Sequence, residues 1–168
     1  MGKQLLVSAS VRRATVSDVP GIHMLISTFA SGEEMLPRTM SELYENIRDF
    51  TVAEVDGRLA GCAALHVTWE TLGEIKSVAV RGDLHHKGIG SLLVSHVIKD
   101  SVVLGLERLF TLTYRPAFFS QFGFTEIPRG MLPHKVWGEC IKCRKFPNCN
   151  ETAMILHTDG SQPDMEAM

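Results

Sequence analysis

The sequence has no apolar run long enough to cross a membrane, which argues against an integral membrane protein. Its first residues, Met1 to Val7, contain a lysine and only a short apolar run, so they are not typical of a secretory signal. Position 6 is a leucine, where a myristoylation site requires Ser or Thr. These absences predict a cytoplasmic protein with no membrane partner.

The sequence also lacks an excess of charge of either sign. It has 17 basic and 19 acidic residues, for a net charge of −2. Nucleic-acid-binding proteins are typically strongly basic, so nucleic acid is not an expected partner. Because neither sign dominates, any charged ligand needs a local site of opposite charge.

Cysteine is scarce as well, with four residues: Cys62, Cys140, Cys143 and Cys149. In a cytoplasmic chain these are expected to be thiols or metal ligands rather than disulfides. The last three lie within residues 129–150, a long irregular segment. Loops of that length are more often functional than idle.

Cys140 and Cys143 have the spacing of a zinc half-site, to which Cys149 and either His134 or His157 could add ligands. A complete second pair is missing. The preferred interpretation is therefore a set of reduced structural thiols without metal, and a zinc ion at these cysteines stays the alternative.

The spacing of apolar residues predicts strands and helices in alternation. Residues that recur at helical spacing predict helices over 19–29, 39–48, 88–104 and 116–122. Runs of strand type cover residues 8–13, 50–55, 59–67, 74–80, 108–114 and 151–157. Asp56-Gly57 is a hairpin signal between two of these strands. Residues 15–18 and Ser41 are candidate helix caps, and Gly123 is expected to end a helix.

This order of elements is typical of a mixed α/β protein built around one sheet. The length of the chain suits a single domain, which we place at residues 1–158. Residues 159–168 are polar and are expected to form a disordered tail.

The most informative segment is a turn between a predicted strand and the helix that starts near residue 88. Gly88 and Gly90 let backbone N–H groups approach a ligand closely. The unbonded N–H groups and the dipole of the helix start favour an anion, so the turn predicts a phosphate site. A tight turn without a ligand is the alternative. The spacing fits neither a P-loop, since Lys87 precedes Gly88, nor a dinucleotide fingerprint, since position 93 is Leu93.

His85-x-x-Gly88-x-Gly90, after Glu74-Ile-Lys-Ser-Val-Ala-Val80, resembles the acetyl-CoA signature of the GNAT superfamily of N-acetyltransferases. The signature has Gln or Arg where this chain has His85. The resemblance implies an acyl-CoA N-acyltransferase fold, with a mostly antiparallel, twisted central sheet flanked by helices. It also implies acetyl-CoA as the acetyl donor.

Further segments resemble the short, stand-alone bacterial N-acetylglutamate synthases. They are Leu36-Pro-Arg38, Asn46 to Phe50, Cys62 to Leu65, Glu74 to Val78, Thr113-Tyr114, Phe118-Phe119, Gly123-Phe124 and Leu132 to Trp137 with the cysteine-rich segment after it. The resemblance spans roughly residues 10–158. It implies transfer of acetyl to the α-amine of L-glutamate, the entry to arginine biosynthesis.

An amine that attacks a thioester must first lose a proton to a base. The resemblance assigns that role to Glu74, at the start of the strand, and His66 is a second candidate. The Tyr that many family members place before Gly-Phe is absent here, so Tyr114 is the candidate donor of a proton to the leaving thiolate. The alternative for Glu74 is an exposed strand residue, and for Tyr114 a packed aromatic.

The resemblance also implies which residues contact acetyl-CoA. The diphosphate is expected on His85, His86, Lys87, Gly88, Ile89, Gly90 and Ser91. The backbone of Val78, Ala79 and Val80 is expected to bind the pantetheine arm and to polarise the carbonyl, because the family fold splays this strand from the next. Phe119 is a further expected contact.

A substrate with two carboxylates needs positive groups. The candidates are Arg38, Lys76 and Lys135, which lie in segments like those of the family; solvated surface cations are the alternative. Strand alternation would place Glu74, Lys76, Val78 and Val80 on one side.

Three other functions stay open. A related acetyltransferase could act on another amino acid, a polyamine, a drug or a protein N-terminus. A non-catalytic acyl-CoA-binding module would bind CoA without turnover. A zinc-stabilised interaction domain would contain stoichiometric metal. The expected partners are a small amine substrate and a second copy of the chain in a homodimer.

Overall fold

The structure is a computed structural model that describes residues 7–133, 138, 140 and 149–161. It has two compact units, Met1–His66 with Ile75–Asp100, and Val67–Glu74 with Ser101–Met168. Seven strands follow the hydrogen-bonded order β1-β2-β3-β4-β5-β7-β6, and β4 contributes to both units. Within the described part of the chain, no helix is both long and apolar enough to traverse a bilayer. The single domain over residues 1–158 stays a prediction.

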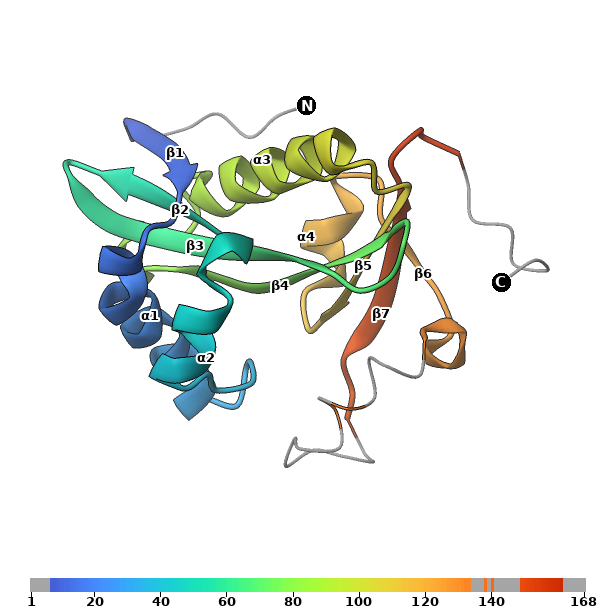
Figure 1. The fold of residues 1–168 in the computed structure, drawn as a ribbon, viewed down its shortest axis with the longest axis horizontal. Helices are drawn as coiled ribbons and strands as arrows, with labels where there is room; N and C mark the ends of the chain where they lie inside the picture. The colour runs from blue at the N-terminus through green and yellow to red at the C-terminus, as the bar shows by residue number, and fades with distance from the viewer. Residues whose placement is uncertain (1–6, 134–137, 139, 141–148, 162–168) are drawn as a thin grey trace. The chain divides into compact units, whose positions relative to one another are not determined.

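The first unit contains strands β1 to β4, helices α1 to α3 and three short 3-10 turns. Its strands are β1 (Ala9–Arg13), β2 (Phe50–Val55), β3 (Arg58–Val67) and most of β4 (Leu72–Val80). Its helices are α1 (Val19–Ser31), α2 (Met40–Glu45) and most of α3 (Ile89–Leu104), and the 3-10 turns are Val16–Asp18, Ile47–Asp49 and Gly82–Leu84. Figure 1 shows α1 and α2 on one face of these strands and α3 on the other.

The β2–β3 hairpin forms at the predicted turn. Asp56 and Gly57 both have positive φ, 51° and 72°, which is the backbone of a tight two-residue hairpin turn. The two strands are antiparallel, with a register shift between Ala53 and Glu54. On its other edge β2 pairs with β1, also antiparallel.

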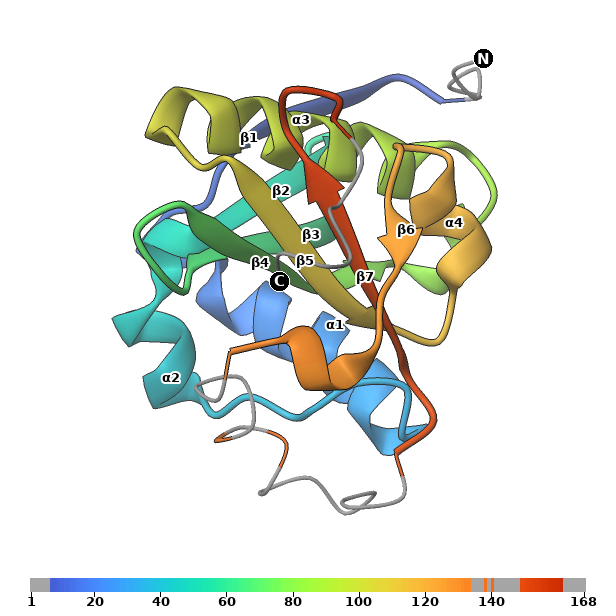
Figure 2. The ribbon, with the colours of Figure 1, turned by 90° about the vertical axis from the view of Figure 1, so that its right-hand side faces the viewer.

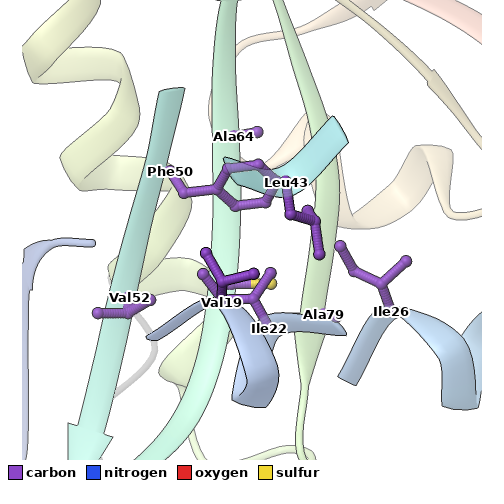
Figure 3. Close-up of a cluster of buried hydrophobic side chains, with 9 residues drawn as sticks. Val19, Ile22, Ile26, Leu43, Phe50, Val52, Ala64 and Ala79 are labelled. Atoms are coloured by element: carbon purple, nitrogen blue, oxygen red, sulfur yellow. The ribbon is translucent and has the colours of Figure 1, made fainter. Parts of the chain in front are cut away.

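Helices α1 and α2 contribute to the first hydrophobic core. The cluster comprises Val19, Ile22, Ile26, Leu43, Phe50, Val52, Cys62, Ala64 and Ala79. Figure 3 shows Val19, Ile22 and Ile26 of α1 in one cluster with Phe50 and Val52 of β2 and Leu43 of α2. Burial of such side chains stabilises each by about 1.5–3 kcal/mol relative to exposure, so this core explains the spacing seen in the sequence.

Two helix starts of this unit differ in how well the sequence predicted them. Thr15 and Asp18, within the predicted cap segment 15–18, form a reciprocal cap at the 3-10 turn Val16–Asp18, and Asp18 also accepts two hydrogen bonds from Arg12, at 2.7 and 2.8 Å. That pairing lowers the pKa of Asp18 to about 2. The prediction of Ser41 as the cap of the second helix is wrong. Thr39 caps it, because its hydroxyl accepts the Glu42 N–H at 3.1 Å while Glu42 bonds back.

The second unit is built on a smaller sheet. Its elements are the start of β4, then β5 (Arg108–Thr113), α4 (Pro116–Ser120), β6 (Thr125–Glu126), the 3-10 turn Arg129–Met131 and β7 (Thr152–His157). The first residues of β4 pair in parallel with Arg108–Phe110 of β5, and β7 pairs antiparallel with both β5 and β6. Figure 2 shows β7 between those two strands. The two-residue β6 was not predicted.

This unit has a core of its own. The cluster comprises Leu72, Phe110, Ile127, Leu132, Ala153 and Ile155. Phe119 and Phe124 lie edge to face at 5.4 Å, and Phe118 contacts Phe119 at 5.1 Å. Gly123 has φ of 95° in the turn after α4, which is the left-handed conformation expected of a glycine at the end of a helix.

Candidate acetyl-CoA site and candidate catalytic residues

The glycine turn, residues 85–91, leads into the start of α3 as predicted. Gly88 is buried and its carbonyl accepts the N–H of Leu92 at 3.0 Å, the first backward hydrogen bond of the helix. The N–H groups of residues 89–91 precede that bond, so they belong to the first turn that an α-helix leaves without internal partners. Such a turn, together with the helix dipole, stabilises a bound anion.

The backbone changes conformation sharply before the helix. His85 is extended, with φ of −62° and ψ of 150°, whereas His86 has φ of 62° and Gly88 has φ of 88°. His86 is not a glycine, so its positive φ is strained and depends on its surroundings.

The side chain of His85 fixes the turn to the end of β4. Its Nε2 lies 2.7 Å from the carbonyl oxygen of Val80, so Nε2 carries the proton and donates. The ring stacks on Phe29 of α1, with 6.0 Å between ring centres. Arg81 adds hydrogen bonds to Leu59 and Asp83. His85 stands where the family signature has Gln or Arg, and its ring holds the turn against Val80 and Phe29.

We expect His85→Ala to weaken acetyl-CoA binding by roughly three- to tenfold, since one partly buried hydrogen bond contributes about 0.5–1.5 kcal/mol. The dissociation constant can be measured by calorimetric titration. His96→Ala, further along α3, is the matched control and should bind normally. Equal affinities for the two variants would contradict a role for His85 in shaping the turn.

Strand β4 contains a feature that the sequence did not predict. Ser77 has φ of 55°, a left-handed conformation that costs a non-glycine residue about 1–2 kcal/mol. The carbonyl of Ser77 accepts the thiol of Cys62 on β3 at 3.4 Å. This residue interrupts the regular alternation predicted from Glu74 to Val80. The side chain of Ala79 is buried in the core. If Ala79 contacts acetyl-CoA as expected, it can do so only through its backbone.

Glu74 belongs to the second unit, where it pairs with Phe110 of β5. Its side chain is half-buried. The pKa of the Cys140 thiol is raised, first by burial and then by nearby negative charges that include Glu74. Glu74 is therefore one of the charges that affect the Cys140 thiol. Its role as a base stays a prediction.

His66, the second candidate base, belongs to the first unit. Its Nδ1 lies 2.6 Å from a carboxylate oxygen of Asp49. A carboxylate at that distance orients the imidazole ring. The sequence did not predict this pair.

Tyr114 precedes α4 in the second unit, and Phe119 lies within that helix. Tyr114 is half-buried and follows the last residue of β5. Phe119 is almost fully buried, with its ring against Phe118 and Phe124. Packing accounts for most of the surface of Phe119. Contacts of either residue with acetyl-CoA stay predictions.

Two of the three predicted substrate cations lie in the first unit. Arg38 is half-buried in the segment that precedes the cap of α2, and Lys76 is half-buried on β4. Lys135 lies outside the described residues, as does His134.

The cysteine-rich segment is described at Cys140 and Cys149. Arg129 donates to the sulfur of Cys149 at 3.3 Å and to the carbonyl of Glu151. His157 is the last residue of β7, at the end of the strand that is farther along the chain from Cys149. The described residues contain no group of three His, Cys, Asp or Glu that could bind a metal. Cys143 lies outside them, so the alternative of zinc is untested there.

Several known proteins are similar to this chain in sequence and in fold. The family model of the GNAT acetyltransferases matches residues 22–124. An amino-acid acetyltransferase of Mycobacterium tuberculosis is 41% identical over 139 residues, which are 81% of this chain and 78% of that protein. A crystal structure from the same organism, in complex with CoA, superposes with a TM-score of 0.78 at 36% identity, over 88% of this chain and 98% of the other.

The N-acetylglutamate synthase of Neisseria gonorrhoeae, complexed with coenzyme A and N-acetyl-glutamate, superposes with a TM-score of 0.82 at 28% identity. The match covers 90% of this chain but 35% of the synthase, so the chain spans about a third of that longer protein. The α/β class and the fold expected from the sequence are confirmed. On the match of the family model and the identity with the mycobacterial enzyme, this chain belongs to the GNAT family of acetyltransferases.

Proposed function

We propose that this chain transfers the acetyl group of acetyl-CoA to the α-amine of L-glutamate, which yields N-acetylglutamate and CoA. The observation that carries the proposal is the pair of relatives described above. One is named as an amino-acid acetyltransferase, and the other is a synthase complexed with CoA and N-acetyl-glutamate. Such a reaction would supply the entry to arginine biosynthesis.

On the donor side, the glycine turn supports the proposal. The N–H groups at the start of α3 and the positive φ of Gly88 suit the diphosphate of acetyl-CoA. The backbone of Val78 to Val80 is the proposed contact for the pantetheine arm. The His85–Val80 hydrogen bond joins these two stretches of chain.

On the acceptor side, the chemistry needs a base, an electrophile and an acid. Glu74 accepts a proton from the ammonium group of the substrate, directly or through water. The neutral amine then attacks the thioester carbonyl, a C–N bond forms and the C–S bond breaks. The leaving thiolate takes a proton from Tyr114, because a thiol pKa near 8.5 makes the protonated form stable at neutral pH. The nitrogen loses its second proton as the amide forms, and an equivalent proton from solvent restores the Tyr114 phenol.

The substrate brings two carboxylates, and their burial has to be offset by positive charge. Arg38 suits a bidentate carboxylate contact, and Lys76 and Lys135 supply point charges. We expect Arg38→Ala to raise the KM for L-glutamate by more than about tenfold, because an unpaired buried carboxylate costs roughly 2–5 kcal/mol. The KM for acetyl-CoA should stay nearly unchanged. Arg48→Ala, at an exposed position ten residues later, is the control.

The substrate is tested by steady-state release of CoA with L-glutamate, L-glutamine, L-aspartate and spermidine. L-Glutamate should have the highest kcat/KM. Glutamine lacks the second charge and aspartate is one methylene shorter, so both should be poorer. Efficient turnover of spermidine with none of glutamate would reduce the proposal to an acetyltransferase for cationic amines. Binding of acetyl-CoA without turnover of any amine would favour a non-catalytic module.

A further inference from the structure

We propose that Cys62 is a positioning residue for acetyl transfer, because its thiol fixes the left-handed backbone of Ser77 in the strand that receives acetyl-CoA. The inference rests on the proposed function, since it assigns a role within the acetyl-CoA site. It does not depend on which amine is the acceptor. All of the residues that carry it lie in the first unit.

The thiol of Cys62 has a polar partner in an otherwise apolar core. Cys62 is fully buried and packs in the cluster with Val19 and Ile22. Its Sγ donates a hydrogen bond to the carbonyl of Ser77 at 3.4 Å, and Ala79 of β4 belongs to the same buried cluster. Burial raises the pKa of this thiol to about 12, so the S–H donor persists at every pH at which an acetyltransferase is assayed.

The partner of the thiol is a strained residue of β4. Ser77 has φ of 55°, a region that a non-glycine residue occupies only where its surroundings enforce it. The hydrogen bond from Cys62 holds the Ser77 carbonyl, and Ala79, two residues later, is buried in the same cluster as Cys62. These two constraints favour a single backbone conformation for residues 77–79.

The preceding residue of β3 shapes the same segment from the other side. A Cβ added at Gly61 would lie 2.9 Å from the carbonyl oxygen of Ala79 and 3.0 Å from Leu93 of α3. Real Cβ atoms essentially never approach that closely, so Gly61 permits β3 and β4 to lie as near as they do. Gly61 and Cys62 therefore both restrain the backbone of β4 just before Val80. The carbonyl of Val80 in turn accepts the hydrogen bond from His85 of the glycine turn.

If Cys62 fixes this segment, the backbone N–H groups of Val78 to Val80 are held in one position relative to the thioester of bound acetyl-CoA. Preorganised N–H donors stabilise the charge that develops on the carbonyl oxygen only if they are held in place before the reaction. Without the thiol, Ser77 is free to relax to the extended conformation that most residues favour. A residue that only fills the core would have no such effect on kinetics.

The experiment compares Cys62→Val, which fills the space but has no donor, with Cys62→Ser, which keeps a donor. Val52→Ala is the control for a perturbed core, because Val52 lies in the same cluster and pairs with Cys62 across β2 and β3, while the variant keeps the thiol. Each variant is characterised by its melting temperature, its affinity for acetyl-CoA by titration, and kcat and KM for both substrates.

We expect Cys62→Val to lower kcat/KM for acetyl-CoA by about tenfold, which corresponds to about 1.4 kcal/mol. Cys62→Ser should recover part of that loss even if it is less stable. In the Cys62→Val background, Ser77→Gly should also restore activity, because glycine adopts positive φ without strain. Val52→Ala should lose stability with kcat/KM nearly unchanged.

Kinetics of Cys62→Val that match those of Val52→Ala, or no recovery with Ser77→Gly, would overturn the inference. Failure of the proposed function gives a different result from failure of this inference. If the wild-type chain does not bind acetyl-CoA, the acetyl-CoA site itself is wrong. If the wild type binds and every Cys62 variant binds and reacts equally well, the site stands and the positioning role is wrong.

Discussion

Gly88→Val is expected to weaken acetyl-CoA binding at least about a hundredfold, equivalent to roughly 3 kcal/mol. Gly88 has φ of 88°, a conformation that a β-branched residue essentially never adopts. Its side chain would also enter the space in which the diphosphate approaches the N–H groups of the helix start. Fluorescence or calorimetric titration with acetyl-CoA measures the loss.

The matched control is Gly82→Ala, a few residues earlier in the 3-10 turn. An added Cβ at Gly82 meets no atom within 4 Å, and its φ is not in the left-handed region. That variant should bind acetyl-CoA as the wild type does, and circular dichroism should show both variants folded. Normal affinity in a folded Gly88→Val protein would remove the glycine turn from the site.

Glu74→Gln is expected to lower kcat by about a hundredfold or more at neutral pH, which is the usual contribution of a general base. The loss should shrink at high pH, where the amine of the substrate is already neutral and needs no base. The KM for acetyl-CoA should change little. A pH profile of kcat for wild type and variant measures the effect.

Glu70→Gln provides the control for Glu74, since it makes the same change of charge at an exposed position in the loop between β3 and β4. It should retain the wild-type rate at every pH. If Glu74→Gln also retains that rate, the base is another group. The His66–Asp49 pair is then the candidate that the structure supports, and His66→Asn is the variant to examine next.

Much of the first unit followed from local signals in the sequence. Asp56-Gly57 predicts a turn because few other residues accept positive φ at two successive positions, and both residues have it. The helix over residues 19–29 followed from apolar spacing, and Val19, Ile22 and Ile26 are fully buried. This turn and this helix depend on residues that are close together in the sequence, so the sequence alone is sufficient to predict them.

The features that escaped prediction depend on partners distant in sequence. The left-handed Ser77 has no signal of its own, because its conformation is linked to a thiol on the neighbouring strand. The ring of His85 acquires its role from the Val80 carbonyl and from Phe29 of α1. Similarly, β6 is two residues long and forms through its pairing with β7, so periodicity could not reveal it.

The cap of α2 shows how near a wrong prediction can lie to the right one. Ser41 and Thr39 are both residues that cap helices, and the deciding signal is the residue three positions later. Thr39 is followed at that spacing by Glu42, which completes a reciprocal cap, whereas Ser41 is followed by Tyr44. A search for the pair of residues, rather than for the hydroxyl alone, would have found the correct start.

The most direct test of glutamate acetylation is a competition among substrates. Wild-type chain is incubated with acetyl-CoA and an equimolar mixture of the twenty amino acids with spermidine, and acetylated products are identified and quantified by mass spectrometry over time. We expect N-acetylglutamate to be the dominant early product with the wild type. The Gly88→Val and Glu74→Gln variants should form almost no N-acetylglutamate. Preferential acetylation of any other amine, with glutamate left unmodified, would contradict this expectation.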